Sequence, residues 1–186
     1  ECAITLEKVE IGVNYAMIIT TNAGLWRYKI GDTIRFTSTN PYRIRVTGRT
    51  KHHINVFGEE LIIENAEEAL KKVAQEFDVE IVDYTVGPVF MKGKYKGAHE
   101  WIVEFEKEPK DIELFSRLLD ESLQNENSDY EAKRNSTLEP LRLHLAKTGL
   151  FYQWLSKKNK LGGQHKVPRL SNTRELLEEL LKMNTS

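Results

Sequence analysis

Three charged residues lie where the sequence pattern would allow them to contact a nucleotide. Asp32 follows a glycine at a break between two strand-like runs, and a carboxylate on such a turn can accept hydrogen bonds from both hydroxyls of a ribose. Arg49 also follows a glycine, and its fork of donors suits phosphate or ribose oxygens. Lys166 lies between Gly162-Gly163 and Pro168, where its ammonium could stabilise charge on a phosphoryl group.

Taken singly, each of these residues has a simpler explanation. Asp32 reads as an ordinary Gly-Asp turn, Arg49 as a surface arginine at a strand end, and Lys166 as a solvated lysine. The chain has neither a Gly-x4-Gly-Lys-Ser/Thr loop nor a Gly-x-Gly-x-x-Gly turn, so no familiar phosphate cradle is present. Its five histidines and single cysteine show no ligand spacing, and we expect no protein-bound metal.

Composition narrows the class of protein. The 186 residues are 40% hydrophobic and 30% charged, as in an ordinary globular protein of one domain plus a fragment, or of two small domains. The net charge of -1 gives no field that would attract nucleic acid or an anionic membrane. No apolar run is long enough to span a bilayer, and the single Cys2 suits a reducing compartment, so we expect a cytoplasmic location.

The first part of the chain has the pattern of a β-rich remnant. Short runs rich in β-branched and aromatic residues alternate with turn residues, and no helical period occurs among them. The pattern predicts a small barrel or curled sheet that lacks a helix to cover one face. The expected strands are residues 2–9, 15–21, 25–30, 33–36 and 42–46.

After residue 50 strands alternate with helices, which predicts a compact α+β domain with a mixed sheet flanked by helices. Apolar residues at helical spacing predict a helix at 64–77, another from about residue 111, and a short one at 150–155. Asn172 with Glu175 has the pattern of a capping box for a last helix. Expected strands are 53–57, 79–86, 101–105 and 141–145, with 92–97 as a basic loop.

Taken in order, the candidate residues lie in motifs that resemble one family. The runs are Gly24-Leu25-Trp26-Arg27-Tyr28-Lys29-Ile30-Gly31-Asp32, Gly48-Arg49-Thr50-Lys51 and Gly163-Gln164-His165-Lys166-Val167-Pro168-Arg169. They resemble the auxin-responsive promoter family of acyl acid–amido synthetases, within the adenylate-forming superfamily. Two stretches are similar to its bacterial branch: Ile54-Asn55-Val56-Phe57-Gly58-Glu59-Glu60 and Asn127-Ser128-Asp129-Tyr130-Glu131-Ala132-Lys133-Arg134.

The resemblance implies a reaction in two steps. A small carboxylic acid would attack ATP, with Mg2+, to give an acyl-adenylate and pyrophosphate, and an amine or amino acid would then take the acyl group. Asp32, Arg49 and Tyr28 would contact the nucleotide, and Lys166 would stabilise the adenylation transition state. Residues 1–48 would be the tail of a large N-terminal adenylation domain, and 49–186 a mobile C-terminal lid.

The same resemblance places a hinge at Arg49, Lys51 and His52, although His52 stands where many superfamily members have an aspartate. We expect the 186 residues alone to be inactive, because the rest of the adenylation domain lies outside them. Two alternatives stay open at this stage. One is an adenylate-forming enzyme with a thiol acceptor, such as an acyl-CoA ligase, and the other is a non-catalytic α+β interaction module.

Overall fold

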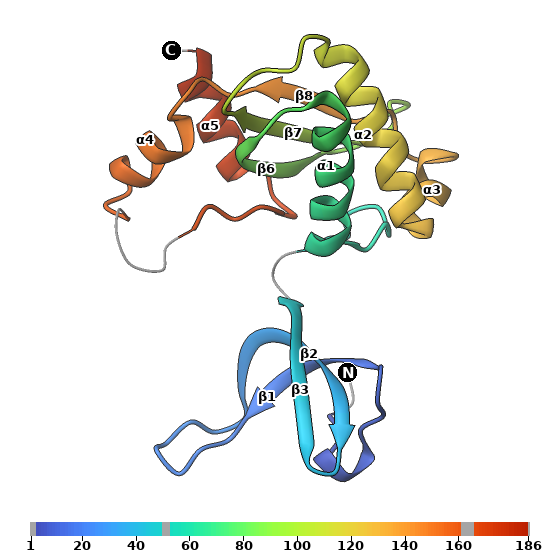
Figure 1. The fold of residues 1–186 in the computed structure, drawn as a ribbon, viewed down its shortest axis with the longest axis vertical. Coiled ribbons are helices and arrows are strands. Elements are labelled where there is room, and N and C mark those ends of the chain that lie inside the picture. Colours follow the sequence, from blue (N-terminus) through green and yellow to red (C-terminus); the bar gives the residue numbers. More distant parts are fainter. Residues whose placement is uncertain (1–2, 50–52, 161–165, 186) are drawn as a thin grey trace. The chain divides into compact units, whose positions relative to one another are not determined.

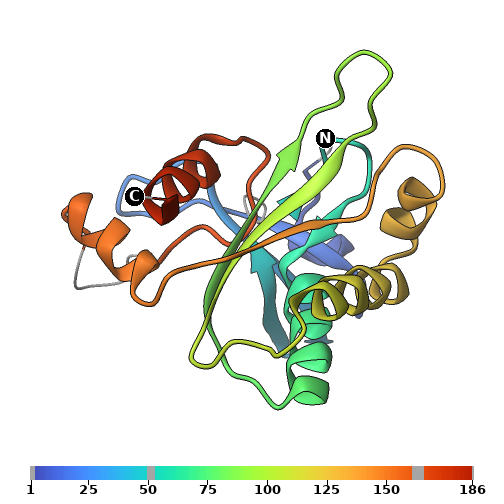
Figure 2. The same ribbon diagram turned by 90° about the horizontal axis from the view of Figure 1, so that it is seen from above.

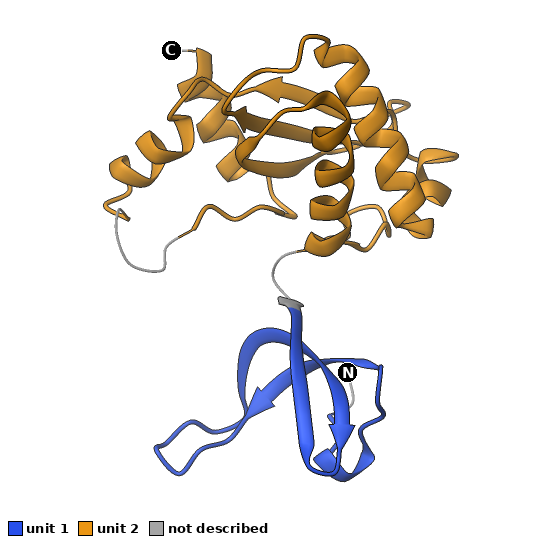
Figure 3. Cartoon of the chain, viewed as in Figure 1, with its two compact units in different colours: residues 1–51 blue, residues 52–186 orange. Residues whose placement is uncertain are grey.

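The computed structural model describes residues 3–49, 53–160 and 166–185. The chain divides into two compact units, Glu1–Lys51 and His52–Ser186 (Figure 3). The predicted boundary between residues 48 and 49 falls just inside the first unit. No helix in the described ranges combines the length and apolarity needed to cross a bilayer.

The first unit is an antiparallel sheet in the order β1-β2-β3. Ile34 and Phe36 of β2 are its buried residues, and the Phe36 ring meets Tyr15 and Tyr42 edge-on, each at 6.0 Å between ring centroids. The elements are the 3-10 turn η1 (Leu6–Lys8), β1 (Asn14–Ile19), β2 (Tyr28–Thr39) and β3 (Tyr42–Arg49).

Two strand predictions for this unit were wrong. Of the predicted strand 2–9, the described residues 3–9 form no strand, because Leu6–Lys8 make a 3-10 turn. The predicted strand 25–30 begins only at Tyr28, and it joins 33–36 in one strand, β2, which continues through Gly31-Asp32. In the pairing with β1, Ala16 lies opposite Thr33 and Ile18 opposite Lys29, so β2 carries extra residues in a bulge there. Gly31 has φ of 87°, which marks a bulge inside the strand and not its end.

The second unit is built around a mixed three-stranded sheet in the order β6-β7-β8 (Figure 1). β6 and β7 are antiparallel, whereas β7 and β8 are parallel. The α+β prediction, with a mixed sheet flanked by helices, is therefore confirmed. The elements are β4 (His53–Ile54), β5 (Leu61–Ile62), α1 (Ile63–Phe77), β6 (Ile81–Val89), β7 (Ala98–Phe105), α2 (Ile112–Glu126), α3 (Ser128–Arg134), β8 (Arg142–Leu145), α4 (Leu150–Lys157) and α5 (Glu175–Thr185).

Helices cover both faces of this sheet, as Figure 2 shows from above, with α1 and α2 on one side and α4 and α5 on the other. Because successive side chains of a strand point to opposite faces of the sheet, β7 contributes residues to two cores. Trp101, Val103 and Phe105 belong to the larger core with α1 and α2. Ile102 belongs to the smaller core with α4, α5 and Val167.

Two details of the helices differ from the predictions. The seven-residue helix α3 was not predicted, because its sequence is too short to show a helical period; Asn127 caps it by accepting a hydrogen bond from the Tyr130 amide at 2.8 Å. The predicted capping box at Asn172 is wrong, since α5 begins only at Glu175. Instead, the Asn172 side chain donates from Nδ2 to the His53 backbone carbonyl at 2.7 Å. Its Oδ1 accepts a hydrogen bond from the Asn55 backbone amide at 2.9 Å.

Candidate functional site

In the first unit, two of the predicted nucleotide residues lie opposite each other. Asp32 of β2 and Arg49 of β3 are direct partners in the antiparallel ladder, next to the pair formed by Thr33 and Gly48. This register places the backbones of the two residues side by side in the sheet. The Asp32 residue is half-buried.

Tyr28, the third predicted nucleotide residue, lies at the start of β2. It pairs with Ile19 of β1 and its residue is 50% exposed, so its ring is available to a ligand. Of the predicted hinge residues, Arg49 ends β3, whereas Lys51 and His52 lie outside the described residues.

In the second unit, Lys166 is exposed, and none of the described residues forms a hydrogen bond or ion pair with it. The very next residue, Val167, is 4% exposed and packs in the smaller core. Lys166 therefore lies directly before a buried residue of the folded unit, a position that holds the lysine backbone while its ammonium stays accessible.

The residues after Lys166 run alongside β6. The Pro168 carbonyl accepts a hydrogen bond from the Thr85 hydroxyl at 2.7 Å, and the Arg169 carbonyl accepts one from the Val86 amide at 2.8 Å. The Ser171 amide returns a bond to the Val86 carbonyl at 3.0 Å, so Val86 and Leu170 form a parallel bridge. This path is non-local, and sequence spacing held no signal for it.

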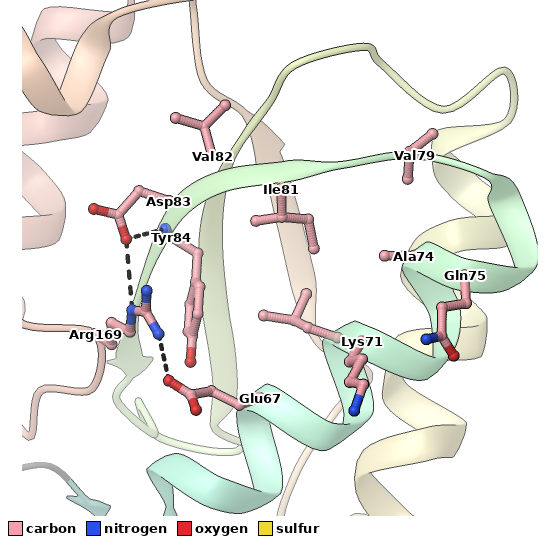
Figure 4. A pocket seen from close by; sticks show the side chains of 11 residues that line it. Glu67, Lys71, Ala74, Gln75, Val79, Ile81, Val82, Asp83, Tyr84 and Arg169 are labelled. Atoms are coloured by element: carbon pink, nitrogen blue, oxygen red, sulfur yellow. Dashed lines mark hydrogen bonds and ion pairs between the residues drawn. The ribbon is translucent and has the colours of Figure 1, made fainter.

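A pocket of ≈ 330 Å³ lies beside this path, between α1 and β6 (Figure 4). The Arg169 guanidinium forms an ion pair with Glu67 of α1 and lies 3.6 Å from the Asp83 carboxylate of β6. It also lies over the Tyr84 ring, 5.1 Å from the ring centroid. Arg169 belongs to the predicted motif around Lys166, but no sequence pattern indicated a role for it.

The electrostatics of this cluster follow from burial and pairing. Burial raises the pKa of the Asp83 carboxyl, and Arg169 offsets only part of that effect. Burial also raises the pKa of Tyr84, whose hydroxyl has no hydrogen-bond partner within the described parts of the chain. Burial opposes the charge of Arg169, but Tyr84 and the two carboxylates outweigh it and raise its pKa. Arg169 and the two carboxylates mainly satisfy one another.

The described residues do not form a cluster of metal ligands. They contain no group of three or more His, Cys, Asp or Glu side chains that could hold an ion. Histidines pair with carboxylates instead: His99 Nε2 lies 2.9 Å from Glu59 Oε1, and His144 Nε2 lies 2.9 Å from Glu100 Oε1. The chemistry that the described side chains offer is hydrogen bonding by Asp32 and a cation at Lys166.

Comparison with known proteins adds a family match on both units. Residues 64–175 match the model of the GH3 family C-terminal domain, and residues 1–49 match that of the GH3 family central domain. Indole-3-acetic acid-amido synthetase GH3.3 of Arabidopsis thaliana is 25% identical over 189 residues, covering 95% of this chain and 32% of that protein. Jasmonoyl-L-amino acid synthetase GH3.5 of Oryza sativa subsp. japonica is 28% identical over 178 residues, covering 91% and 30%.

Two solved structures share the fold. The GH3.15 acyl acid amido synthetase superposes with a TM-score of 0.78 at 24% identity, covering 97% of this chain and 34% of that one. A 2-hydroxyisobutyryl-CoA ligase in the postadenylation state superposes with a TM-score of 0.54 at 15% identity, covering 95% and 36%. The chain thus spans about a third of the length of these relatives. Its resemblance to the bacterial branch stays a prediction.

Proposed function

The chain belongs to the GH3 family, and we propose from this that it is the C-terminal part of an ATP-dependent acyl acid amido synthetase. The longer protein adenylates a small carboxylic acid and passes the acyl group to an amine or amino acid. Support for the reaction class comes from the amido synthetases that align with nearly the whole chain. The alternative with a thiol acceptor is supported only by the shared fold of the 2-hydroxyisobutyryl-CoA ligase, which is 15% identical.

The observation that carries the proposed mechanism is the setting of Lys166. Its side chain is exposed, and its neighbour Val167 is buried in the smaller core. Adenylation builds negative charge on phosphate oxygens and needs little covalent help, so a positioned cation is the useful group. We assign that charge stabilisation to the Lys166 ammonium.

Asp32 would bind the ribose hydroxyls of ATP, with Arg49 beside it and Tyr28 against the nucleotide. The two ladder positions fit this role because β-strands hold side chains more precisely than a loop does. Mg2+ would accompany the ATP phosphates in the longer protein. The described residues of this chain offer no cluster of side chains to hold the ion.

The proposed domain roles follow the family match. Residues 1–48 would complete the large adenylation domain, and 49–186 would be a lid that turns at Arg49, Lys51 and His52. Turning the lid away after adenylation would remove Lys166 and clear space for the amine. A cytoplasmic location is part of the same proposal.

A product assay tests the proposed function. The full-length protein is given ATP, a panel of carboxylic acids, and either amino acids or coenzyme A, and the products are identified by mass. We expect acyl amides, AMP and pyrophosphate. Acyl-CoA as the product would support the thiol alternative, and no adenylation of any acid would contradict the proposal. The 186 residues alone are expected to show no ATP–pyrophosphate exchange.

A further inference from the structure

Backbone contacts alone hold the segment after Lys166 only weakly. Residues 166–171 form one parallel bridge with β6, through Val86 and Leu170, and a single-residue bridge contributes few hydrogen bonds. Local structure with few bonds opens easily in a folded protein. A catalytic lysine displaced by about 1 Å can lose on the order of a hundredfold in rate. Two buried side chains also hold the segment: Val167 packs in the smaller core, and Leu170, 1% exposed, packs in the larger core.

The Arg169 side chain adds a polar contact three residues from Lys166. It joins the segment to two other elements at once, through Glu67 of α1 and Asp83 of β6. The stack on Tyr84 adds a third contact, and Tyr84 is only 3% exposed, so the ring itself is fixed in the core. A planar guanidinium can serve two carboxylates and one ring together, which a lysine ammonium cannot do.

We propose that Arg169 is a positioning residue for Lys166. It holds the backbone three residues beyond the lysine against α1 and β6, and so fixes the point from which the ammonium reaches the phosphates of ATP. This inference deepens the proposed function and rests on it. It assigns Arg169 no contact with substrate.

The test uses the full-length protein with Lys166→Ala, Arg169→Met and the double variant. ATP–pyrophosphate exchange measures adenylation. We expect Arg169→Met to lower kcat on the order of 10- to 100-fold, with KM for ATP within about twofold of the parent. In the double variant we expect no loss beyond that of Lys166→Ala, because Arg169 acts through the lysine. Arg169→Lys should restore part of the activity.

Arg174→Met is the matched control. Arg174 is paired like Arg169, with Glu100 at 2.8 Å and Glu178 at 3.1 Å, but it lies at the start of α5. We expect its loss to leave kcat close to that of the parent. The inference is overturned if Arg169→Met behaves like Arg174→Met, or if its effect multiplies with that of Lys166→Ala.

Amide hydrogen exchange on the full-length protein separates this inference from the proposed function. Arg169→Met should speed exchange at the Val86 and Ser171 amides at least about tenfold, while α2 stays protected. Unchanged exchange at both amides would overturn the positioning role, whatever reaction the protein performs. If exchange rises but Lys166→Ala keeps full adenylation, the proposed function fails, and Arg169 only holds the segment.

Discussion

At the scale of single residues, Asp32 is the group that we propose for recognition of the ribose. It lies on the bulged part of β2, opposite Arg49, where the ladder fixes its direction. A carboxylate accepts from two hydroxyls at once, whereas a carboxamide offers one accepting oxygen. The structure therefore gives this residue a more specific setting than the turn that its sequence pattern indicated.

Replacing Asp32 by Asn in the full-length protein should raise the Kd for ATP about tenfold to a hundredfold. Hydrogen bonds to a charged group contribute about 1.5–3 kcal/mol each, and 1.4 kcal/mol is a factor of ten. Calorimetric titration with ATP measures the change. Glu10→Gln, at an exposed residue of the same unit, is the control. An unchanged Kd in Asp32→Asn would remove Asp32 from the nucleotide site.

Glu59 and His99 form a fully buried pair between the segment after β4 and β7. The Glu59 carboxylate also accepts a hydrogen bond from the Phe57 amide at 2.7 Å. Burial alone would raise the pKa of Glu59, but the hydrogen bond and charge of His99, with the backbone amides of Phe57 and Glu59, lower the pKa below its ordinary value. A lowered carboxyl pKa contributes stability above the ordinary pKa, and that stability is lost as pH falls through the lower, folded value.

Glu59→Gln should therefore reduce the free energy of unfolding at neutral pH by about 2 kcal/mol, and flatten its fall in acid. Urea unfolding of the 186-residue chain at neutral and acidic pH measures both effects. Glu121→Gln, an exposed carboxylate on α2, should leave the pH profile as it is. An acid profile in Glu59→Gln as steep as that of the parent would contradict this account.

At the scale of elements, a side chain from strand β7 caps the N-terminus of helix α4. Glu104 of β7 is 3% exposed and accepts hydrogen bonds from the Gly149 amide at 2.6 Å and the Phe151 amide at 3.3 Å. Its carboxylate thus caps the first turn of α4, where unpaired amides and the helix dipole favour negative charge. Gly149 has φ of 79°, a conformation that suits glycine at this cap.

Glu104→Ala should destabilise the chain by about 2–3 kcal/mol, because it leaves two amides without an acceptor where water cannot easily enter. Glu104→Gln keeps a carbonyl acceptor and should cost less. Urea unfolding followed by circular dichroism gives both free energies. If alanine and glutamine were equally tolerated, the cap would contribute nothing.

The elements also show how far the sequence could be read. Apolar spacing predicted α1, α2, α4 and the strands of the mixed sheet, since each is long enough to show its own period. Gly31-Asp32 was misread as a strand end, because a glycine in a strand signals a bulge as well as a turn. Asn172 was misread as a cap, since its true partners are the backbones of His53 and Asn55, more than a hundred residues away.

For the candidate site, the sequence indicated the residue types but not the contacts between distant segments. The residue types at positions 32, 49 and 166 carried a chemical signal that local sequence could express. The ladder pairing of Asp32 with Arg49 and the ion pairs of Arg169 are contacts between distant segments, and no spacing rule encodes them. The nucleotide roles of Tyr28, Asp32, Arg49 and Lys166 remain predictions.

At the scale of the whole molecule, the first unit exposes many large apolar side chains for its size. Trp26 is 79% exposed, and the others are Ile4, Leu6, Ile11, Val13, Ile18, Leu25, Tyr28, Ile30, Tyr42, Ile44 and Val46. Exposed apolar surface of this kind is typical of a contact with further protein. It supports the proposal that residues 1–48 complete a larger adenylation domain, since the relative GH3.3 is about three times as long as this chain.

The central claim is that the Lys166 ammonium acts in adenylation and leaves before acyl transfer. The direct measurement compares both half-reactions in the full-length protein and in Lys166→Ala, using ATP–pyrophosphate exchange for the first and a preformed acyl-adenylate with amine for the second. The account predicts that exchange falls on the order of a hundredfold or more while transfer stays within about threefold of the parent. Equal losses in the two half-reactions would contradict it.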